Sequence, residues 1–285
     1  MNDSITSSRL QLLGRFHLKH AGESIELCMN AQRLVAFLYL SGRSSRTLAA
    51  GTLWPDVAEE RARGSLRTTL WHLPHGNPTV IECSGDNLSL SCAVSVDVTT
   101  LEEVALRVVQ SNGLLDAPPP LELLTRGDLL PGWDEDWILL ERERIRQLRL
   151  HALDKLAEGL TQQGRHALAL EAALASVRIE PLRESAHRAV ISVHLAENNI
   201  GEAIRHYRMF VRLLREQLNV EPSQEFISAC STQRTWNLLR NEATITTGSR
   251  RTNPQPSRSR SNNTATHSPP RPSHDRANRG RPGDH

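Results

Sequence analysis

Two stretches of the chain repeat one pattern at an offset of 34 residues, and this repeat restricts the fold more than any other feature. The stretch QGRHALALEAA aligns with ENNIGEAIRHY, 34 residues further along. Gly164 falls on Asn198, and glycine and asparagine most readily take the left-handed backbone conformation that ends a helix. Ala169 falls on Ala203, so small side chains stand where two antiparallel helices would come close. The repeat predicts stacked helical hairpins.

A period of 34 residues is that of tetratricopeptide-type hairpins, so we expect a domain of this kind after the proline-rich joint APPP. Pro181 and Pro222 each follow the second helix of a pair. The run ERERIRQLR at 141–149 is interpreted as a solvated helix face. Four aromatic residues could line a partner groove, although a place in the core between helices is favoured: Trp133, Trp137, Tyr207 and Phe210.

The first hundred residues carry a different pattern. Residues 9–27 alternate apolar and polar side chains between turn signals, which predicts short antiparallel strands. Three helices follow: one capped by Asn30 and ending at Gly42, one capped by Thr47, and one from about Ala58 to Leu73. The stretch TVIECSGDNLSLS then predicts a hairpin. A sheet, three helices and a hairpin in this order indicate a winged helix-turn-helix.

The third of these helices has an apolar face, which includes Leu66 and Leu70, and a polar face opposite. That polar face and its flanks carry Arg61, Arg63, Gly64, Arg67, Thr68, Trp71, His72 and His75. Arginine binds guanine edges or phosphates, and threonine contacts a thymine methyl group. The pattern favours a DNA recognition helix. An ordinary solvated amphipathic helix is the alternative.

The stretch LAAGTLWPD…EERARGSLRTTLWHL resembles the OmpR-type winged-helix domain of the Streptomyces antibiotic regulatory protein family, with Trp54, Leu66 and Leu73 among the matching positions. The resemblance implies that bases and phosphates are contacted by Arg63, Arg67, Thr68, Thr69, Trp71 and His72. With the exposed positions above, the candidate DNA-binding residues are Thr47, Arg61, Arg63, Arg67, Thr68, Thr69, Trp71, His72 and His75. The chain departs from the family in lacking arginines at the end of this helix and an aromatic or basic residue in the wing.

The segment GDLLPGWDEDWILLERERIRQLRLHAL and the later PLRESAHRAV…EPS resemble the bacterial transcriptional activator domain of the same family. Together the two modules cover residues 9–230. The resemblance implies a sequence-specific DNA-binding transcriptional regulator, which is expected to activate a gene cluster such as one for secondary metabolism. Its implied partners are double-stranded DNA with promoter direct repeats, RNA polymerase and a second copy of the chain. No GxxxxGK[ST] motif occurs, so no nucleotide cofactor is expected.

Two other classes of function are alternatives to this interpretation. The first is a tetratricopeptide-like interaction adaptor whose winged helix binds DNA weakly or not at all; the missing arginines favour it and Arg61, Arg63 and Arg67 oppose it. The second is an enzyme, which the absence of GxSxG, HExxH, GxGxxG and P-loop motifs disfavours. We therefore expect no catalytic residues and no cofactor. A metal site at His72 and His75 is not expected, because a proline breaks the helix between them.

Composition sets the limits of the folded part. The longest apolar run, Leu34 to Leu40, is too short for a membrane span, so a cytoplasmic protein that does not enter membranes is expected, with its four cysteines buried as small apolar residues. The net charge is +2, yet residues 244–285 hold eight arginines against two aspartates and only one large apolar residue. Such a segment is expected to be disordered, and either to attract phosphates or to have no specific role.

These patterns define a mainly α chain: an N-terminal winged helix-turn-helix (α+β), a tetratricopeptide-like α-helical domain and a disordered tail. The predicted limits are 9–96 for the DNA-binding domain, 97–243 for the bacterial transcriptional activator domain and 244–285 for the basic tail.

Overall fold

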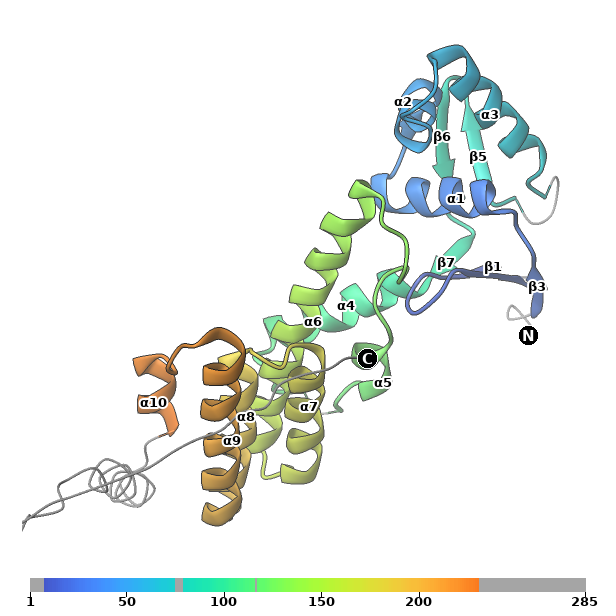
Figure 1. The fold of residues 1–285 in the computed structure, drawn as a ribbon. Helices are drawn as coiled ribbons and strands as arrows, with labels where there is room; N and C mark the ends of the chain where they lie inside the picture. The colour runs from blue at the N-terminus through green and yellow to red at the C-terminus, as the bar shows by residue number, and fades with distance from the viewer. Residues whose placement is uncertain (1–7, 75–78, 116, 231–285) are drawn as a thin grey trace, which may run out of the picture. The chain divides into compact units, whose positions relative to one another are not determined.

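The structure is a computed structural model that describes residues 8–74, 79–115 and 117–230 (Figure 1). Its order of elements confirms the predicted fold class of a small N-terminal β region with helices, followed by an α-helical part. The predicted tail and the end of the predicted activator domain lie outside the described residues. The domain limits themselves stay predictions.

The chain begins with the predicted antiparallel strands, β1 (Ser8–Gln11), β2 (His17–His20) and β3 (Glu23–Ile25). A fourth strand, β7 (Val94–Val96), pairs in parallel with β1 and was not predicted, because three residues are too few for a clear alternation. The sheet order is β3-β2-β1-β7. Leu10 and its neighbours in the pleat point into the core, so one face of the sheet is covered and the other carries polar side chains.

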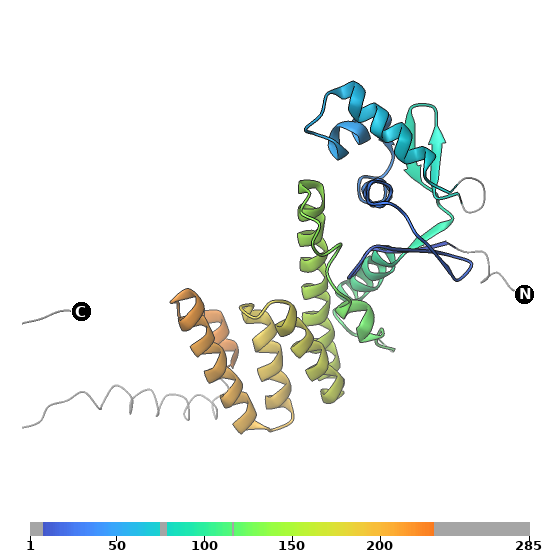
Figure 2. The ribbon, with the colours of Figure 1, turned by 45° about the vertical axis from the view of Figure 1, so that its right-hand side comes forward.

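The three predicted helices follow as α1 (Met29–Ser41), α2 (Arg46–Leu53) and α3 (Glu59–Trp71). The predicted hairpin is formed by β5 (Ile81–Ser84) and β6 (Asn87–Leu90), and the two-residue strand β4 (Ser44–Ser45) pairs with β6. Figure 2 shows α3 running beside this hairpin. The helices and the hairpin have the arrangement of a winged helix-turn-helix.

Both predicted helix caps were wrong, although the predicted helices exist. Helix α1 begins after Cys28, so Asn30 lies within its first turn. Helix α2 is capped by Ser45, whose hydroxyl accepts a hydrogen bond of 3.1 Å from the backbone N–H of Leu48. Serine is as good a cap as threonine, and a cap oxygen bonds the N–H three residues later, so Ser45 takes this role and Thr47 becomes an exposed helical residue. Gly42 ends α1 with a positive φ of 68°, as predicted.

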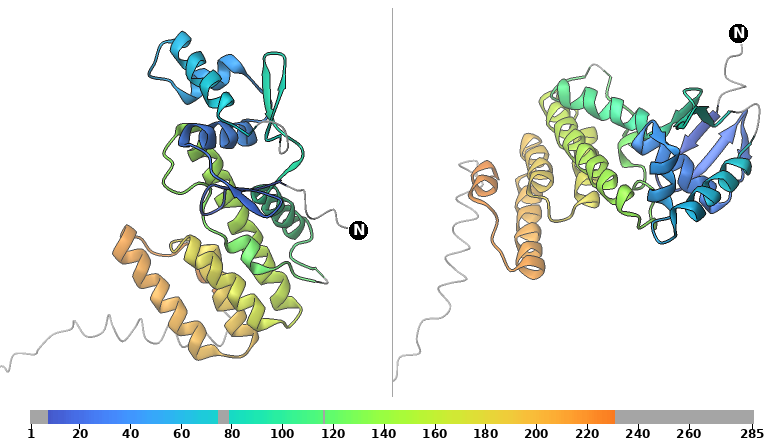
Figure 3. Two further views of the ribbon diagram at one scale, coloured as in Figure 1. Left: turned by 90° about the vertical axis from the view of Figure 1, so that its right-hand side faces the viewer. Right: turned by 90° about the horizontal axis from the view of Figure 1, so that it is seen from above.

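The remaining helices form the C-terminal part. They are α4 (Asp97–Gln110), α5 (Leu121–Thr125), α6 (Asp136–Gln162), α7 (His166–Ile179), α8 (Glu184–Ala196), α9 (Ile200–Leu218) and α10 (Gln224–Cys230). Helices α6 to α9 pack side by side in chain order (Figure 3). No helix within the described ranges is long and apolar enough to cross a membrane.

The 34-residue repeat has the structural basis that the sequence indicated. Gly164 and Asn198 both have positive φ angles, 72° and 60°, at the turns between paired helices. Ala169 and Ala203 are both buried where those helices meet. The repeated segments are therefore two equivalent helical hairpins, α6–α7 and α8–α9.

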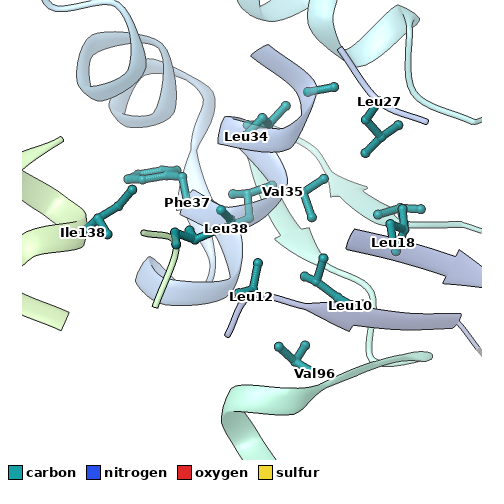
Figure 4. Packing of buried hydrophobic residues seen from close by; sticks show 14 of the residues in the cluster. Leu10, Leu12, Leu18, Leu27, Leu34, Val35, Phe37, Leu38, Val96 and Ile138 are labelled. Atoms are coloured by element: carbon teal, nitrogen blue, oxygen red, sulfur yellow. The ribbon is translucent and has the colours of Figure 1, made fainter. Parts of the chain in front are cut away.

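The N-terminal core extends into the helical part. Ile138 of α6 lies beside Phe37 of α1 in Figure 4, and both belong to the same buried cluster. Trp137 contacts Phe37 edge-on with ring centroids 5.5 Å apart, and Trp133 stacks on Phe16 at 6.2 Å. The prediction that these tryptophans lie in the core between repeat helices was wrong, because both are half-buried and pack against the N-terminal cluster. Phe210 is fully buried, as predicted.

The run at 141–149 is only partly the solvated face that was predicted. Arg149 is 2% exposed and donates hydrogen bonds to the carbonyls of residues 124, 126 and 127. Arg142 donates to three further carbonyls, those of Leu129, Leu130 and Trp133, at 2.7–2.8 Å. Both arginines therefore hold the segment that precedes α6. The cysteine prediction was also wrong for three of the four residues: only Cys230 is buried, because Cys28, Cys83 and Cys92 lie at element ends or on the hairpin.

Candidate nucleic-acid interface

Helix α3 separates a buried stripe from an exposed one. Ala62 and Leu66 are buried against the N-terminal core. The exposed stripe holds Arg61, Arg67 and Thr68, which the sequence singled out. A helix that enters a DNA groove needs an exposed stripe of such polar and basic side chains.

Thr69 was predicted to contact DNA, and the structure contradicts this. It is 4% exposed, and its hydroxyl donates a hydrogen bond of 2.8 Å to the carbonyl of Ser65 in the preceding turn. The spacing from Ala62 to Leu66 and Thr69 is the i, i+4, i+7 pattern of a single helix face. That spacing could have placed Thr69 on the buried side from the sequence alone.

Arg63 joins the first turn of α3 to the start of α2. Its guanidinium lies 2.8 Å from a carboxylate oxygen of Glu59 and donates a hydrogen bond of 2.9 Å to the hydroxyl of Thr47. Both side chains of the ion pair are at least half exposed, so the pair contributes little to stability. The arrangement brings Thr47 and Arg63 together on one surface, where a phosphate could replace Glu59 as the partner of Arg63.

The end of α3 presents an aromatic residue in place of arginines. Trp71 is 72% exposed, and its ring meets that of His72 edge-on with centroids 5.1 Å apart. The His72 ring nitrogen Nδ1 lies 2.7 Å from the carbonyl oxygen of Thr68, to which it donates. This hydrogen bond fixes the imidazole of His72 on the helix, whereas the indole of Trp71 stays open to solvent. His75 lies outside the described residues.

A pocket of about 340 Å³ lies between the end of α3 and the hairpin. Arg67 and Trp71 line it from α3, and Ile81 and Cys83 line it from β5. Arg46, the first residue of α2, lines it as well and was missed by the sequence reasoning. The sequence feature that could have identified Arg46 is its place next to a serine at the beginning of the second helix. Arg46 and Arg67 thus add positive charge at the wing, where the hairpin itself carries none.

The chain thus combines a helix that has one exposed and one buried face, beside a β-hairpin, with two helical hairpins that follow. Residues 123–230 match the family described as bacterial transcriptional activator domain. That domain belongs to regulators of transcription rather than to enzymes. The match starts in α5 and ends with α10, so it covers the helical hairpins.

Known proteins agree with this assignment. The chain is 26% identical over 228 residues to the regulatory protein AfsR of Streptomyces coelicolor, an alignment that covers 75% of this chain and 23% of AfsR. The chain therefore spans less than a quarter of that relative's length. A solved structure of Mycobacterium tuberculosis EmbR, in complex with a low-affinity phosphopeptide, matches with a TM-score of 0.64 at 15% identity, covering 85% of this chain and 71% of that one. These matches confirm the resemblance to the Streptomyces antibiotic regulatory protein family.

Proposed function

We propose that the chain is a sequence-specific DNA-binding regulator of transcription that uses α3 as its recognition helix. The observation that carries the proposal is the exposed stripe of α3, on which Arg61 and Arg67 make no ion pair within the described part of the chain. Unpaired arginines on a helix whose other face is buried are free to contact phosphates or guanine edges. Thr68 and Trp71 extend this surface toward the hairpin.

The proposed partners follow from the two halves of the molecule. Double-stranded DNA with promoter direct repeats is the partner of the winged helix, and RNA polymerase or a second copy of the chain is the partner of the helical hairpins. The match to a transcriptional activator domain supports activation rather than repression. More specifically, we propose that the chain acts in the cytoplasm and controls a gene cluster such as one for secondary metabolism. The similarity to AfsR, which is described as a regulatory protein, supports the regulatory role in general.

The first experiment tests whether α3 reads DNA. Arg67→Ala should weaken binding to the operator by about 1–3 kcal/mol, because an arginine contact to a base or phosphate is worth about that much. The matched control is Arg205→Ala on α9, which also removes an exposed arginine but from the helical part. Operators come from immunoprecipitation of the protein with its genomic DNA. If the recovered genomic sites share a short repeat but Arg67→Ala binds them as tightly as the wild type, an element other than α3 reads the DNA.

A second candidate function is that of an interaction adaptor whose winged helix does not bind DNA. The observation that favours it is the hairpin, which carries Glu82 and Asp86 and no basic residue. Two carboxylates on a wing would repel a phosphate backbone. Random recovery of genomic DNA in the same immunoprecipitation, with no shared short repeat, would support the adaptor and refute the regulator.

A further inference from the structure

The uncovered face of the N-terminal sheet carries a row of polar side chains that crosses all four strands. In the observed register Ser24 pairs with Lys19, Lys19 with Arg9, and Arg9 with Ser95. The neighbouring residues in the pleat, such as Leu10 and Leu18, point into the core. Arg9 and Lys19 are both exposed, so two cations stand directly opposite each other at the centre of this face.

Like charges on directly opposite residues of an antiparallel pair destabilise a sheet, since their Cβ atoms lie only about 5 Å apart. Within the described residues, neither Arg9 nor Lys19 has an ion-pair partner that would offset the repulsion. The acid among the described residues that line their pocket is Asp97, and its two carboxylate oxygens accept hydrogen bonds from the backbone N–H groups of Leu12 and Leu13, at 2.9 and 3.2 Å. The two cations are therefore left without a counter-ion.

These side chains line a pocket of about 590 Å³. A third cation, Arg126, lines it from the segment after α5, and Gln11, His17 and Thr100 add polar groups. The backbone at Arg126 is held in place, because its carbonyl accepts a hydrogen bond from the buried guanidinium of Arg149. With three cations against Asp97, the pocket has a net positive charge on a fixed frame.

We propose that this pocket binds a small molecule that carries a diphosphate group. Its volume is within the range of small-molecule sites, roughly 300–1,000 Å³. A phosphoryl group between Arg9 and Lys19 would relieve their repulsion, and the guanidinium groups suit phosphate oxygens because they donate in a planar fork. A second phosphoryl group would meet Arg126, which is contributed by a different element. A single monovalent anion would leave that third cation unused.

The pocket is separate from the proposed DNA interface, since none of its lining residues belongs to α2, α3 or the β5–β6 hairpin. Its lining comes from β1, β2, β7, the start of α4 and the segment around α5. A bound diphosphate would therefore connect the N-terminal sheet to the segment that begins the activator domain match at residue 123. The proposal stands whether or not α3 binds DNA.

Titration calorimetry of the full chain with inorganic pyrophosphate, and then with ADP, tests this site at constant ionic strength. We expect saturable binding of one equivalent, at least tenfold weaker in Arg9→Gln and in Lys19→Gln. Arg205→Gln, which removes an exposed arginine of α9, should bind like the wild type. Far-UV circular dichroism of each variant confirms that the sheet is intact.

Four results would overturn the proposal. The first is no saturable heat with either compound. The second is an equal loss of binding in Arg9→Gln and Arg205→Gln, which would indicate general charge screening. The third is weaker binding of duplex DNA by Arg9→Gln with no pyrophosphate binding by the wild type, which would assign these cations to the DNA backbone. A titration with inorganic phosphate at the same concentrations distinguishes a site for a single phosphate from a site for a diphosphate. Binding of phosphate as tight as that of pyrophosphate would refute a diphosphate site.

Discussion

Replacement of Arg149 by methionine should destabilise the fold by about 3 kcal/mol, because hydrogen bonds from a charged donor are worth about 1.5–3 kcal/mol each and are not additive. The guanidinium donates to the carbonyls of Leu124, Arg126 and Gly127. The carbonyl of the buried Leu124 would lose its partner, whereas water can reach the other two, which belong to exposed residues. Asp128 adds little, since it lies 3.5 Å from the guanidinium and is half exposed.

An apolar replacement also removes the desolvation of a buried charge, which lowers the pKa of Arg149 from its ordinary value. Buried ion pairs can be exchanged for apolar residues without loss when both partners are changed, but here the acceptors are backbone carbonyls that remain. The loss of the hydrogen bonds should therefore outweigh the gain. About 3 kcal/mol corresponds to a fall in the melting temperature of roughly 6–12 °C for a folded part of this size.

The assay is thermal unfolding followed by circular dichroism, with urea unfolding to obtain the free energy. The matched control is Arg146→Met on the same helix, whose guanidinium pairs with Glu143 and Glu180 near the surface. Such pairs contribute up to about 1 kcal/mol, so the control should lose much less stability. Equal losses in the two variants would refute the assignment of Arg149 as a residue that holds the segment before α6.

Two further predictions concern the packing of the helices. His187 and His206 are hydrogen-bonded at 2.9 Å between α8 and α9, and burial lowers the pKa of both, that of His206 to about 4. Stability should be complete above the ordinary histidine pKa of about 6.5 and fall as the pH drops toward 4; thermal unfolding between pH 7.5 and 4.5 measures this, and His206→Gln should flatten the profile. Gly159→Ala should destabilise by about 1–3 kcal/mol, because its Cβ would lie 2.3 Å from a backbone oxygen of the α4–α5 loop. Gly201→Ala, with no atom within 4 Å of the new Cβ, should stabilise α9 by about 0.5–1 kcal/mol in the same urea titration; the reverse order would contradict the packing.

The elements that the sequence predicted best are those whose signals are local. A helix end at Gly42, Gly164 or Asn198 needs only a residue that takes a positive φ, and such residues are visible in the sequence. The same holds for the β5–β6 hairpin, where glycine and aspartate form the turn. Helical periodicity placed the exposed stripe of α3, and the error at Thr69 came from giving the family resemblance more weight than that periodicity.

The features that escaped prediction depend on contacts between distant parts of the chain. The burial of Arg149 follows from acceptors more than twenty residues away, and a run of alternating charges on α6 gives no sign of them. Arg46 became part of the candidate interface only because α2 begins beside the hairpin. The pocket on the sheet combines strands near residue 10 with Arg126, so its charge is invisible until the register and the α5 segment are known.

The end of β1 is one of the places where the two halves of the molecule are joined. The carbonyl of Leu12 accepts a hydrogen bond of 2.9 Å from the N–H of Leu130, and the N–H of Gly14 donates one of 2.8 Å to the backbone carbonyl of Asp128. The N–H of Leu12 is bound in turn by the carboxylate of Asp97 at the start of α4. Both flanks of the segment after β1 are therefore fixed by residues outside the winged helix. Because Arg149 fixes the same loop from α6, a change in the packing of α6 on this loop would reach β1 and the cations of the proposed diphosphate site. A second connection runs from Trp137 and Ile138 of α6 directly to Phe37 of α1.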